Sequence, residues 1–313
     1  MASSASSKVV PELGLVCMTL SERCRFRTIT RSRFLSLSEL EQEKSLEELY
    51  WANLHRTDAA LTFCDQNHIR LYRMSSSLFP MSDYPLGEKV LRRFSTLLSG
   101  IGRRAERLGI RVIIHPDQFV VLSSESRQVV RTSIKIMCKH ALTLDLMGLP
   151  RSAWATMILH GGKAGRGDFL VKMIPKLPIE IRSRLSLEND EHAYGAEEIL
   201  DVCQRAGVPM IFDNLHHVVR EKLPSHDHPS IARFVKLAAA TWPDPSWQVV
   251  HLSNGHEGLH DERHSHLIEH FPKAFRKVPF VEIEAKGKED AIAGVRETFF
   301  TSKKSVPKAL PEA

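Results

Sequence analysis

Short apolar stretches rich in β-branched residues alternate along the chain with longer segments whose apolar residues recur at helical spacing. Eight of the short stretches are typical of strands, at residues 13–16, 69–73, 111–115, 157–160, 185–188, 209–213, 248–251 and 280–284. Helical periodicity marks residues 46–67, 90–108, 128–147, 196–206, 231–240, 265–275 and 290–299. This alternation of strands and helices predicts βαβ units and therefore a parallel sheet.

Eight repeats of strand and helix are the number that closes a TIM barrel. The alternative, an open doubly wound sheet that binds a dinucleotide, lacks its G-x-G-x-x-G signature after a strand. We therefore predict an α/β fold with a single (β/α)8 TIM barrel in residues 12–300, a disordered leader in residues 1–11 and a disordered tail in residues 301–313. The leader lacks the apolar segment of a secretory signal, and no apolar run approaches the ~20 residues of a membrane helix.

The charge balance permits a polyanionic partner, because the 313 residues carry a formal net charge of +6. Five arginines fall in one short segment that contains no acidic residue, namely Arg23, Arg25, Arg27, Arg31 and Arg33. Such a segment either follows a phosphate backbone or is a solvated loop. The five cysteines are scattered without a CxxC pair, which indicates reduced thiols and argues against a cysteine-rich zinc site.

The last residue of most predicted strands is a potential metal ligand. These residues are His115, His160, Glu188, Asp213, His251 and Glu284, whereas the second strand ends in Arg73. In a closed parallel barrel the carboxyl ends of all strands meet at the face where active sites are built. A lone Asp after a strand often only caps the next helix. Six such residues at equivalent positions instead predict a metal centre, since bound divalent cations offset the repulsion between buried carboxylates.

Further histidines lie close to this set in the sequence. His216 follows Asp213 by three residues, and four others lie between residues 256 and 266, namely His256, His260, His264 and His266. Mixed nitrogen and oxygen ligands without thiolates suit Mn, Zn, Fe or Co. The set is too large for one open catalytic ion, so we expect two or three ions. Clustered ions are typical of phosphoester hydrolysis, although sugar isomerases also use metal pairs in barrels.

Six segments resemble the UV-damage endonuclease family in their order and spacing. They are RMSSSLFP at 73–80, HPDQFVVLSS at 115–124, HGG at 160–162, LENDE at 187–191, FDNLHH at 212–217 and VEIEAKGKE at 281–289. The resemblance covers roughly residues 12–295. As a set these motifs are highly specific, whereas HGG alone would mean little.

This resemblance implies a TIM barrel that holds two or three divalent ions, usually Mn²⁺, with Zn²⁺, Co²⁺ or Mg²⁺ as alternatives. It implies nicking of duplex DNA immediately 5′ to cyclobutane pyrimidine dimers, 6-4 photoproducts and some other lesions, which leaves a 3′-hydroxyl and a 5′-phosphate. Glu188 and Glu284 would take catalytic roles as residues that bridge or anchor the ions. The metal ligands that the motifs imply are His115, His160, Glu188, Asp213, His216, His251, His264 and Glu284.

The resemblance also implies residues that contact DNA. Gln118 and Phe119 match the pair that probes the duplex at the lesion, where a flat ring can replace lost stacking and an amide can bond to base edges. Other members often carry Tyr at the position of Phe119, and some carry Lys at the position of Val249. Lys286, in an EAK motif, is expected either to act as a catalytic residue that contacts the phosphate or to be a solvated lysine. Arg73 and the five arginines of residues 23–33 are expected to hold the DNA backbone.

Three alternatives fit part of the pattern. An abasic-site endonuclease would use the same ions. A metal-dependent sugar isomerase or epimerase would explain the ligands, but neither the arginine-rich segment nor the Gln118–Phe119 pair. A DNA-damage binding protein without turnover would be expected to have lost a ligand.

We expect damaged double-stranded DNA as the partner, a monomer, and no membrane association. In a bacterium the protein would be cytoplasmic and associated with the nucleoid through DNA. In a eukaryote it would be nuclear or organellar.

Overall fold

Eight parallel strands form a closed barrel in the computed structural model, which describes residues 10–21 and 24–301. Each strand pairs with the next along the chain, and the last pairs with the first. The strands are β1 (Glu12–Val16), β2 (Leu71–Met74), β3 (Arg111–Ile114), β4 (Met157–His160), β5 (Leu185–Glu188), β6 (Met210–Asp213), β7 (Val249–Leu252) and β8 (Phe280–Ile283). The predicted TIM barrel is therefore confirmed. The predicted leader up to residue 9, the predicted tail from residue 302 and Arg23 lie outside the described residues.

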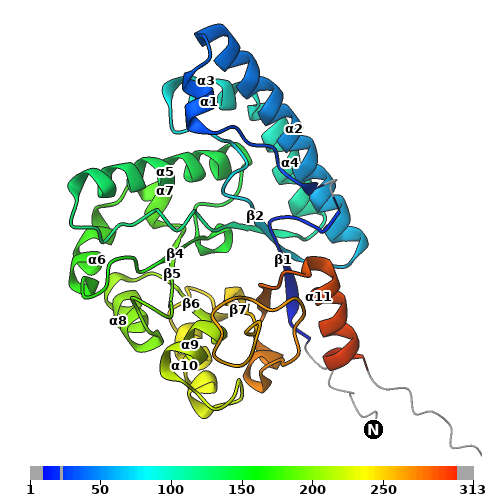
Figure 1. Cartoon of the computed structure of the whole chain (residues 1–313), viewed down its shortest axis with the longest axis vertical. Helices are drawn as coiled ribbons and strands as arrows, with labels where there is room; N and C mark the ends of the chain where they lie inside the picture. The colour runs from blue at the N-terminus through cyan, green and yellow to red at the C-terminus, as the bar shows by residue number, and fades with distance from the viewer. Residues whose placement is uncertain (1–9, 22–23, 302–313) are drawn as a thin grey trace, which may run out of the picture.

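Helices surround the strands, as Figure 1 shows, and α11 packs beside β1 where the barrel closes. The α-helices in the described residues are α1 (Arg31–Leu35), α2 (Glu39–Gln66), α3 (Pro85–Arg93), α4 (Ser95–Arg107), α5 (Arg127–Leu146), α6 (Gly167–Met173), α7 (Ile179–Arg182), α8 (Ala196–Ala206), α9 (Asn214–Glu221), α10 (Pro229–Ala239) and α11 (Lys288–Val295). Helices α1, α6, α7 and α9 are additions to the predicted set. Among these described helices, none combines the length and the apolar character that crossing a membrane requires.

Two helices differ from their predicted extent for local reasons. Helix α2 begins well before its predicted start, because Ser38 and Glu41 form a capping box in which each side chain bonds to the other residue's backbone N–H. The helix predicted at residues 90–108 is wrong as a single element, since it is broken into α3 and α4 at Phe94. The Phe94 ring packs against Tyr50 of α2, with ring centroids 6.5 Å apart. Tertiary packing therefore decides both boundaries.

The helix predicted at residues 265–275 is also wrong. This segment is a loop that ends in a short 3₁₀ helix, Lys273–Lys277. The side chain of Asn254 accepts hydrogen bonds from the backbone N–H groups of Glu269 and His270, both at 2.8 Å. Pro272 has no N–H to donate to a helix. The backbone groups of this segment are thus satisfied without helical hydrogen bonds.

Alternate residues along each strand point into the barrel, because side-chain direction has a period of two in a strand. At the amino-terminal end the inward residues form an apolar floor of Leu71, Ile113, Ile158, Ile211 and Val249, packed with Trp242. Two positions further along the strands the inward residues are polar, namely Arg73, His115, His160, Asp213 and His251. The same alternation places Ser186 and Glu188 of β5 inward, whereas Leu185 and Leu187 pack against the helices. A polar layer therefore lies directly above the apolar floor.

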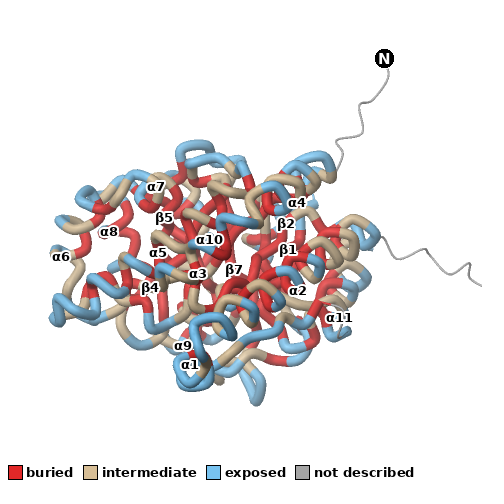
Figure 2. Tube along the Cα trace, turned by 90° about the horizontal axis from the view of Figure 1, so that it is seen from above, coloured by how far each residue is buried: buried red, intermediate tan, exposed pale blue. Residues whose placement is uncertain are grey.

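Arg111 closes the amino-terminal end of the barrel. Its guanidinium is buried, and it donates hydrogen bonds to the carbonyl oxygens of Ala153, Trp154 and Trp247 at 2.6–2.9 Å. The guanidinium carbon also lies 4.6 Å from the ring centre of Trp154 and 4.8 Å from that of Phe280. Figure 2 shows buried strands at the centre, with the exposed segments outside. Because this end is filled, the polar layer is accessible from the carboxyl ends of the strands.

Candidate metal centre

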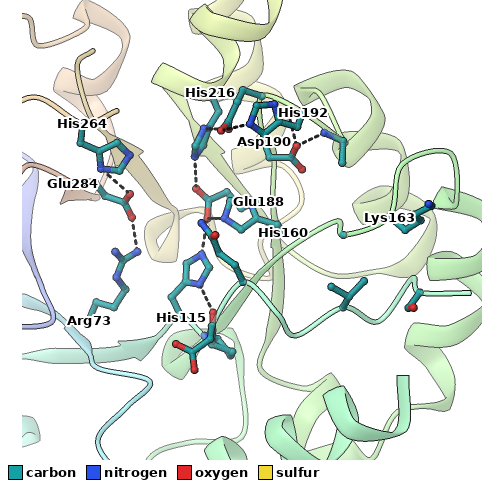
Figure 3. A pocket seen from close by; sticks show the side chains of 18 of the residues that line it. Arg73, His115, His160, Lys163, Glu188, Asp190, His192, His216, His264 and Glu284 are labelled. Carbon is teal, nitrogen blue, oxygen red and sulfur yellow. Dashed lines mark hydrogen bonds and ion pairs between the residues drawn. The ribbon is translucent and has the colours of Figure 1, made fainter. Parts of the chain in front are cut away.

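A cavity of about 750 Å³ opens at the carboxyl ends of the strands. Six of the eight predicted ligands line it, namely His115, His160, Glu188, His216, His264 and Glu284 (Figure 3). The other two, Asp213 and His251, are fully buried beneath it. The six strands β3 to β8 bring six of these residues to one place because each strand ends at or beside one of them, while α9 adds His216 and the loop after β7 adds His264. The predicted convergence of ligand-type side chains is present in the structure.

Glu188, at the end of β5, lies at the centre of the site. Its Oε2 is 3.1 Å from Nε2 of His115 and 3.9 Å from Nε2 of His160. Its Oε1 is 2.8 Å from Nδ1 of His251 and 3.9 Å from Nε2 of His216. Four imidazoles from different segments thus face one buried carboxylate, as Figure 3 shows for three of them.

Seven of the eight predicted ligands form three overlapping groups. Within each group, one ligand atom from each residue lies within 4.8 Å of the others. The groups are His115–His160–Glu188, Glu188–Asp213–His216 and Asp213–His251–Glu284. Glu188 belongs to the first two groups and Asp213 to the last two. Shared carboxylates are what a cluster of bridged divalent ions requires.

Asp213 offers an unused buried acceptor at this site. Its Oδ1 accepts the backbone N–H of His216 at 2.8 Å and so caps α9. Its Oδ2 is buried and has no hydrogen-bond partner among the described residues. A buried carboxylate oxygen without a partner is costly unless a cation lies beside it. The residues present therefore fit a divalent cation.

His264 lies at the edge of the ligand groups. Its Nδ1 is 3.7 Å from Oε2 of Glu284, and about a third of its side chain is exposed. A β-bridge between Gly255 and His264 holds it in the loop after β7. His264 belongs to none of the three groups formed by the described residues, so its role as a ligand stays a prediction.

The buried carboxylates and imidazoles of the site strongly shift one another's pKa values. Burial, joined by the charge of Glu188, raises the pKa of Asp213. Burial also raises the pKa of Glu188, but His251 and the other imidazoles hold it well below its usual range. Burial lowers the pKa of His216, whereas Asp213 and Glu191 raise it to about 10. The protonated imidazole of His216 thus balances part of the carboxylate charge, and a divalent cation would displace its proton.

Two of the ring nitrogens that turn away from Glu188 lie beside another oxygen, whereas Nδ1 of His160 is buried without a hydrogen-bond partner among the described residues. Nδ1 of His115 lies 2.8 Å from the carbonyl oxygen of Pro116. Nδ1 of His216 pairs with a carboxylate oxygen of Glu191. Such outer partners fix the orientation of a histidine ligand. The sequence analysis did not single out Glu191, although it lies within the LENDE motif.

Lys163 is a cation in the cavity wall that the sequence analysis also missed. Ser123 positions its loop by donating to the carbonyl oxygen of Gly161 at 2.8 Å and accepting the backbone N–H of Lys163 at 2.6 Å. Gly162 has a φ of +81°, and a Cβ there would lie 2.9 Å from Val121. The glycines of the HGG motif therefore allow the close approach that brings Lys163 to the cavity.

The predicted lesion-probing pair lies at the rim of the cavity. Gln118 lines the cavity, and the adjacent Phe119 is 65% exposed. Phe119 is thus a solvent-exposed ring, which excludes a place in the core. A large apolar side chain at the entrance of a polar cavity is available to contact a ligand. The contact of either residue with DNA stays a prediction.

The predicted phosphate-contacting residues have different surroundings. Arg73 lines the cavity, and its Nη1 lies 2.8 Å from Glu282 and 2.5 Å from Glu284. Lys286 is exposed and does not line the cavity, although it follows Glu284 by two residues. The described arginines of the predicted basic segment are exposed, and none of them lines the cavity; they are Arg25, Arg27, Arg31 and Arg33. Their predicted contacts with DNA are not tested by this geometry.

A family model described as UV-endonuclease UvdE matches residues 11–306. The chain belongs to this family. The UV DNA damage endonuclease of Nostoc sp. is 52% identical over 288 residues, which are 91% of this chain and 89% of that protein. The enzyme of the same name from Deinococcus radiodurans is 48% identical over 296 residues, which are 94% and 97% of the two chains. The crystal structure of SacUVDE matches with a TM-score of 0.77 at 28% identity, and it covers 92% of this chain and 98% of that chain. The resemblance predicted from the motifs is confirmed.

Proposed function

We propose that this UvdE-family protein is a metal-dependent endonuclease that cuts DNA damaged by ultraviolet light. The observation that carries the proposal is the set of three overlapping ligand groups beneath an open cavity. The two bacterial relatives named UV DNA damage endonuclease support the choice of substrate. In its finer form, the protein nicks duplex DNA immediately 5′ to cyclobutane pyrimidine dimers and 6-4 photoproducts, and leaves a 3′-hydroxyl and a 5′-phosphate.

Two or three divalent ions would be held by the three ligand groups, with Glu188 and Asp213 shared between neighbouring ions. Imidazole and carboxylate ligands without thiolates favour Mn²⁺, with Zn²⁺, Co²⁺ and Mg²⁺ as alternatives. When bound, the ions supply Lewis acidity, which lowers the pKa of a water molecule and stabilises a leaving oxygen. The chain itself would keep Glu188 and Glu284 fixed through buried contacts with His251 and Arg73.

The cavity suits extruded nucleotides better than an intact duplex. Its volume of about 750 Å³ lies in the range that encloses a ligand of drug size. Damaged bases leave the stack more cheaply than intact ones, because their stacking is already disturbed. Phe119 at the rim would fill the gap that they leave, and Gln118 would bond to exposed base edges. Lys163 and Lys286 would meet the phosphate groups beside the cut.

Supercoiled plasmid gives a direct test. We expect relaxed circles when irradiated plasmid is incubated with the protein and Mn²⁺, and none from untreated plasmid or after chelation with EDTA. DNA polymerase should extend the nicks, because they carry a 3′-hydroxyl. Cleavage of depurinated plasmid alone would indicate an abasic-site endonuclease instead. Conversion of a ketose without any nicking would indicate a sugar isomerase or epimerase and would refute the proposal.

A further inference from the structure

Glu282 is an inward-facing residue of β8 that lies between the apolar floor and the cavity. Its side chain is fully buried, and it is not among the residues that line the cavity. One carboxylate oxygen lies 2.8 Å from Nη1 of Arg73, and the other lies 3.2 Å from Nε2 of His251. The strand register places Glu282 opposite His251. A buried charge is costly unless it is paired, so these two partners account for a carboxylate at this depth.

The two ring nitrogens of His251 face different carboxylates. Nδ1 lies 2.8 Å from Glu188 and 3.4 Å from Glu284, and it therefore points toward the ligand groups. Nε2 lies 3.2 Å from Oε2 of Glu282, a close contact in which neither atom completes a hydrogen bond among the described residues. A neutral imidazole that binds a cation through Nδ1 must carry its proton on Nε2, and a buried Nε2–H needs an acceptor. Glu282 is placed to be that acceptor.

The same arrangement recurs at two neighbouring histidines. His115 and His216 each direct Nε2 toward Glu188, while Nδ1 has another acceptor. That acceptor is the carbonyl oxygen of Pro116 for His115 and the carboxylate of Glu191 for His216. An outer oxygen thus fixes each ring, which is the usual arrangement around metal-bound histidine.

Glu282 also acts on the opposite wall of the site through Arg73. The same Nη1 atom of Arg73 contacts Glu282 at 2.8 Å and Glu284 at 2.5 Å. Glu282 therefore contacts both the Arg73 guanidinium, which faces Glu284, and the His251 imidazole, which faces Glu188. Loss of the Glu282 charge would loosen two predicted metal ligands, His251 directly and Glu284 through Arg73.

We propose that Glu282 is a positioning residue of the metal centre. It holds His251 with Nδ1 directed to the ions, and it holds Arg73 against Glu284. It touches neither substrate nor ion itself. The inference deepens the proposed function and rests on it, because it requires divalent ions to bind at these ligand groups.

The role of Glu282 can be tested without DNA by titrating the metal-free protein with Mn²⁺. The EPR signal of the free ion measures how much Mn²⁺ remains unbound. Glu282→Gln keeps the shape and removes the charge, so we expect Mn²⁺ affinity to fall about 10- to 100-fold, the range seen when outer partners of metal ligands are removed. Glu282→Asp keeps the charge and should lose less. Glu106→Gln, an exposed change on α4, is the matched control and should bind as the wild type does.

A double-variant cycle with His251→Ala separates positioning from a general structural role. Because Glu282 acts partly through His251 and partly through Arg73, Glu282→Gln should lower the affinity by a smaller factor in the His251→Ala background than in the wild type. An equal fold-loss in both backgrounds, or wild-type affinity in Glu282→Gln, would overturn the inference. If circular dichroism shows that Glu282→Gln does not fold, Glu282→Asp decides, and wild-type affinity in that variant overturns it.

Failure of this inference differs from failure of the proposed function. A wild-type protein that binds Mn²⁺ but does not nick irradiated DNA would defeat the proposed function, and the cycle would still support the inference. Wild-type affinity in Glu282→Gln would defeat only the inference. A wild-type protein that binds no Mn²⁺ would overturn both.

Discussion

Replacement of Glu188 by Gln removes the charge at the centre of the site with almost no change of shape. The carboxylate accepts from His115 at 3.1 Å and from His251 at 2.8 Å. After the change, one oxygen remains and the other becomes an NH₂ group, which cannot accept a proton or bind a cation. Loss of an outer partner of a metal ligand already costs about 10- to 100-fold in activity or affinity. We therefore expect loss of this shared ligand to slow nicking by at least about 100-fold, which is about 2.7 kcal/mol of transition-state stabilisation.

Binding of damaged DNA should survive this change, because Gln118 and Phe119 lie at the rim and not at the ligand groups. Single-turnover nicking of irradiated plasmid measures the chemical step, and a gel shift with irradiated oligonucleotide measures binding. Glu106→Gln, exposed on α4, serves as the control and should match the wild type in both assays. A nicking rate for Glu188→Gln within about tenfold of the wild type would refute the central role of Glu188.

Three further predictions concern other parts of the molecule. Phe119→Ala should change the free energy of unfolding by no more than about 0.5 kcal/mol, because the ring is exposed. It should weaken binding of irradiated DNA by about 5- to 150-fold, because a stacking contact is lost. Equal binding of the variant and the wild type in a gel shift would contradict this. Asp213→Asn keeps the cap of α9 and removes a buried carboxyl whose pKa burial and Glu188 raise; the melting temperature without metal should stay or rise, and its increase with Mn²⁺ should disappear. Burial lowers the pKa of His226 to about 4. As the pH falls from about 7 to 4, His226 therefore takes up a proton in the unfolded protein before it does so in the folded protein. The free energy of unfolding should fall by up to about 3 kcal/mol over this range. Urea melts should show a smaller fall for His226→Gln.

Most of the barrel was predictable because its strands obey a simple rule. Each strand is a short apolar run, and its inward positions change from apolar to ligand-type at the carboxyl end, as from Ile211 to Asp213 on β6. That change along one strand is visible in the sequence. It predicted which residues meet at the site, although not which of them form each ligand group.

The remaining features depend on contacts between distant segments. Glu282 follows an apolar residue within β8 like any solvent-facing residue of a strand, and only the closed barrel reveals its burial beside His251. Glu191 is one charge in a loop, and its partner His216 lies on another segment. The loop that replaces the helix predicted at residues 265–275 is organised by Asn254, which lies outside that segment. Local periodicity contains no signal for such contacts.

The number and place of the bound ions test the central claim most directly. Crystals grown with Mn²⁺ and measured on both sides of the manganese absorption edge would locate each ion by its anomalous signal. We expect two or three peaks at the carboxyl ends of the strands, with Glu188 or Asp213 between neighbouring peaks. Absence of peaks among these residues, or a single peak away from Glu188, would contradict the account of a bridged metal cluster.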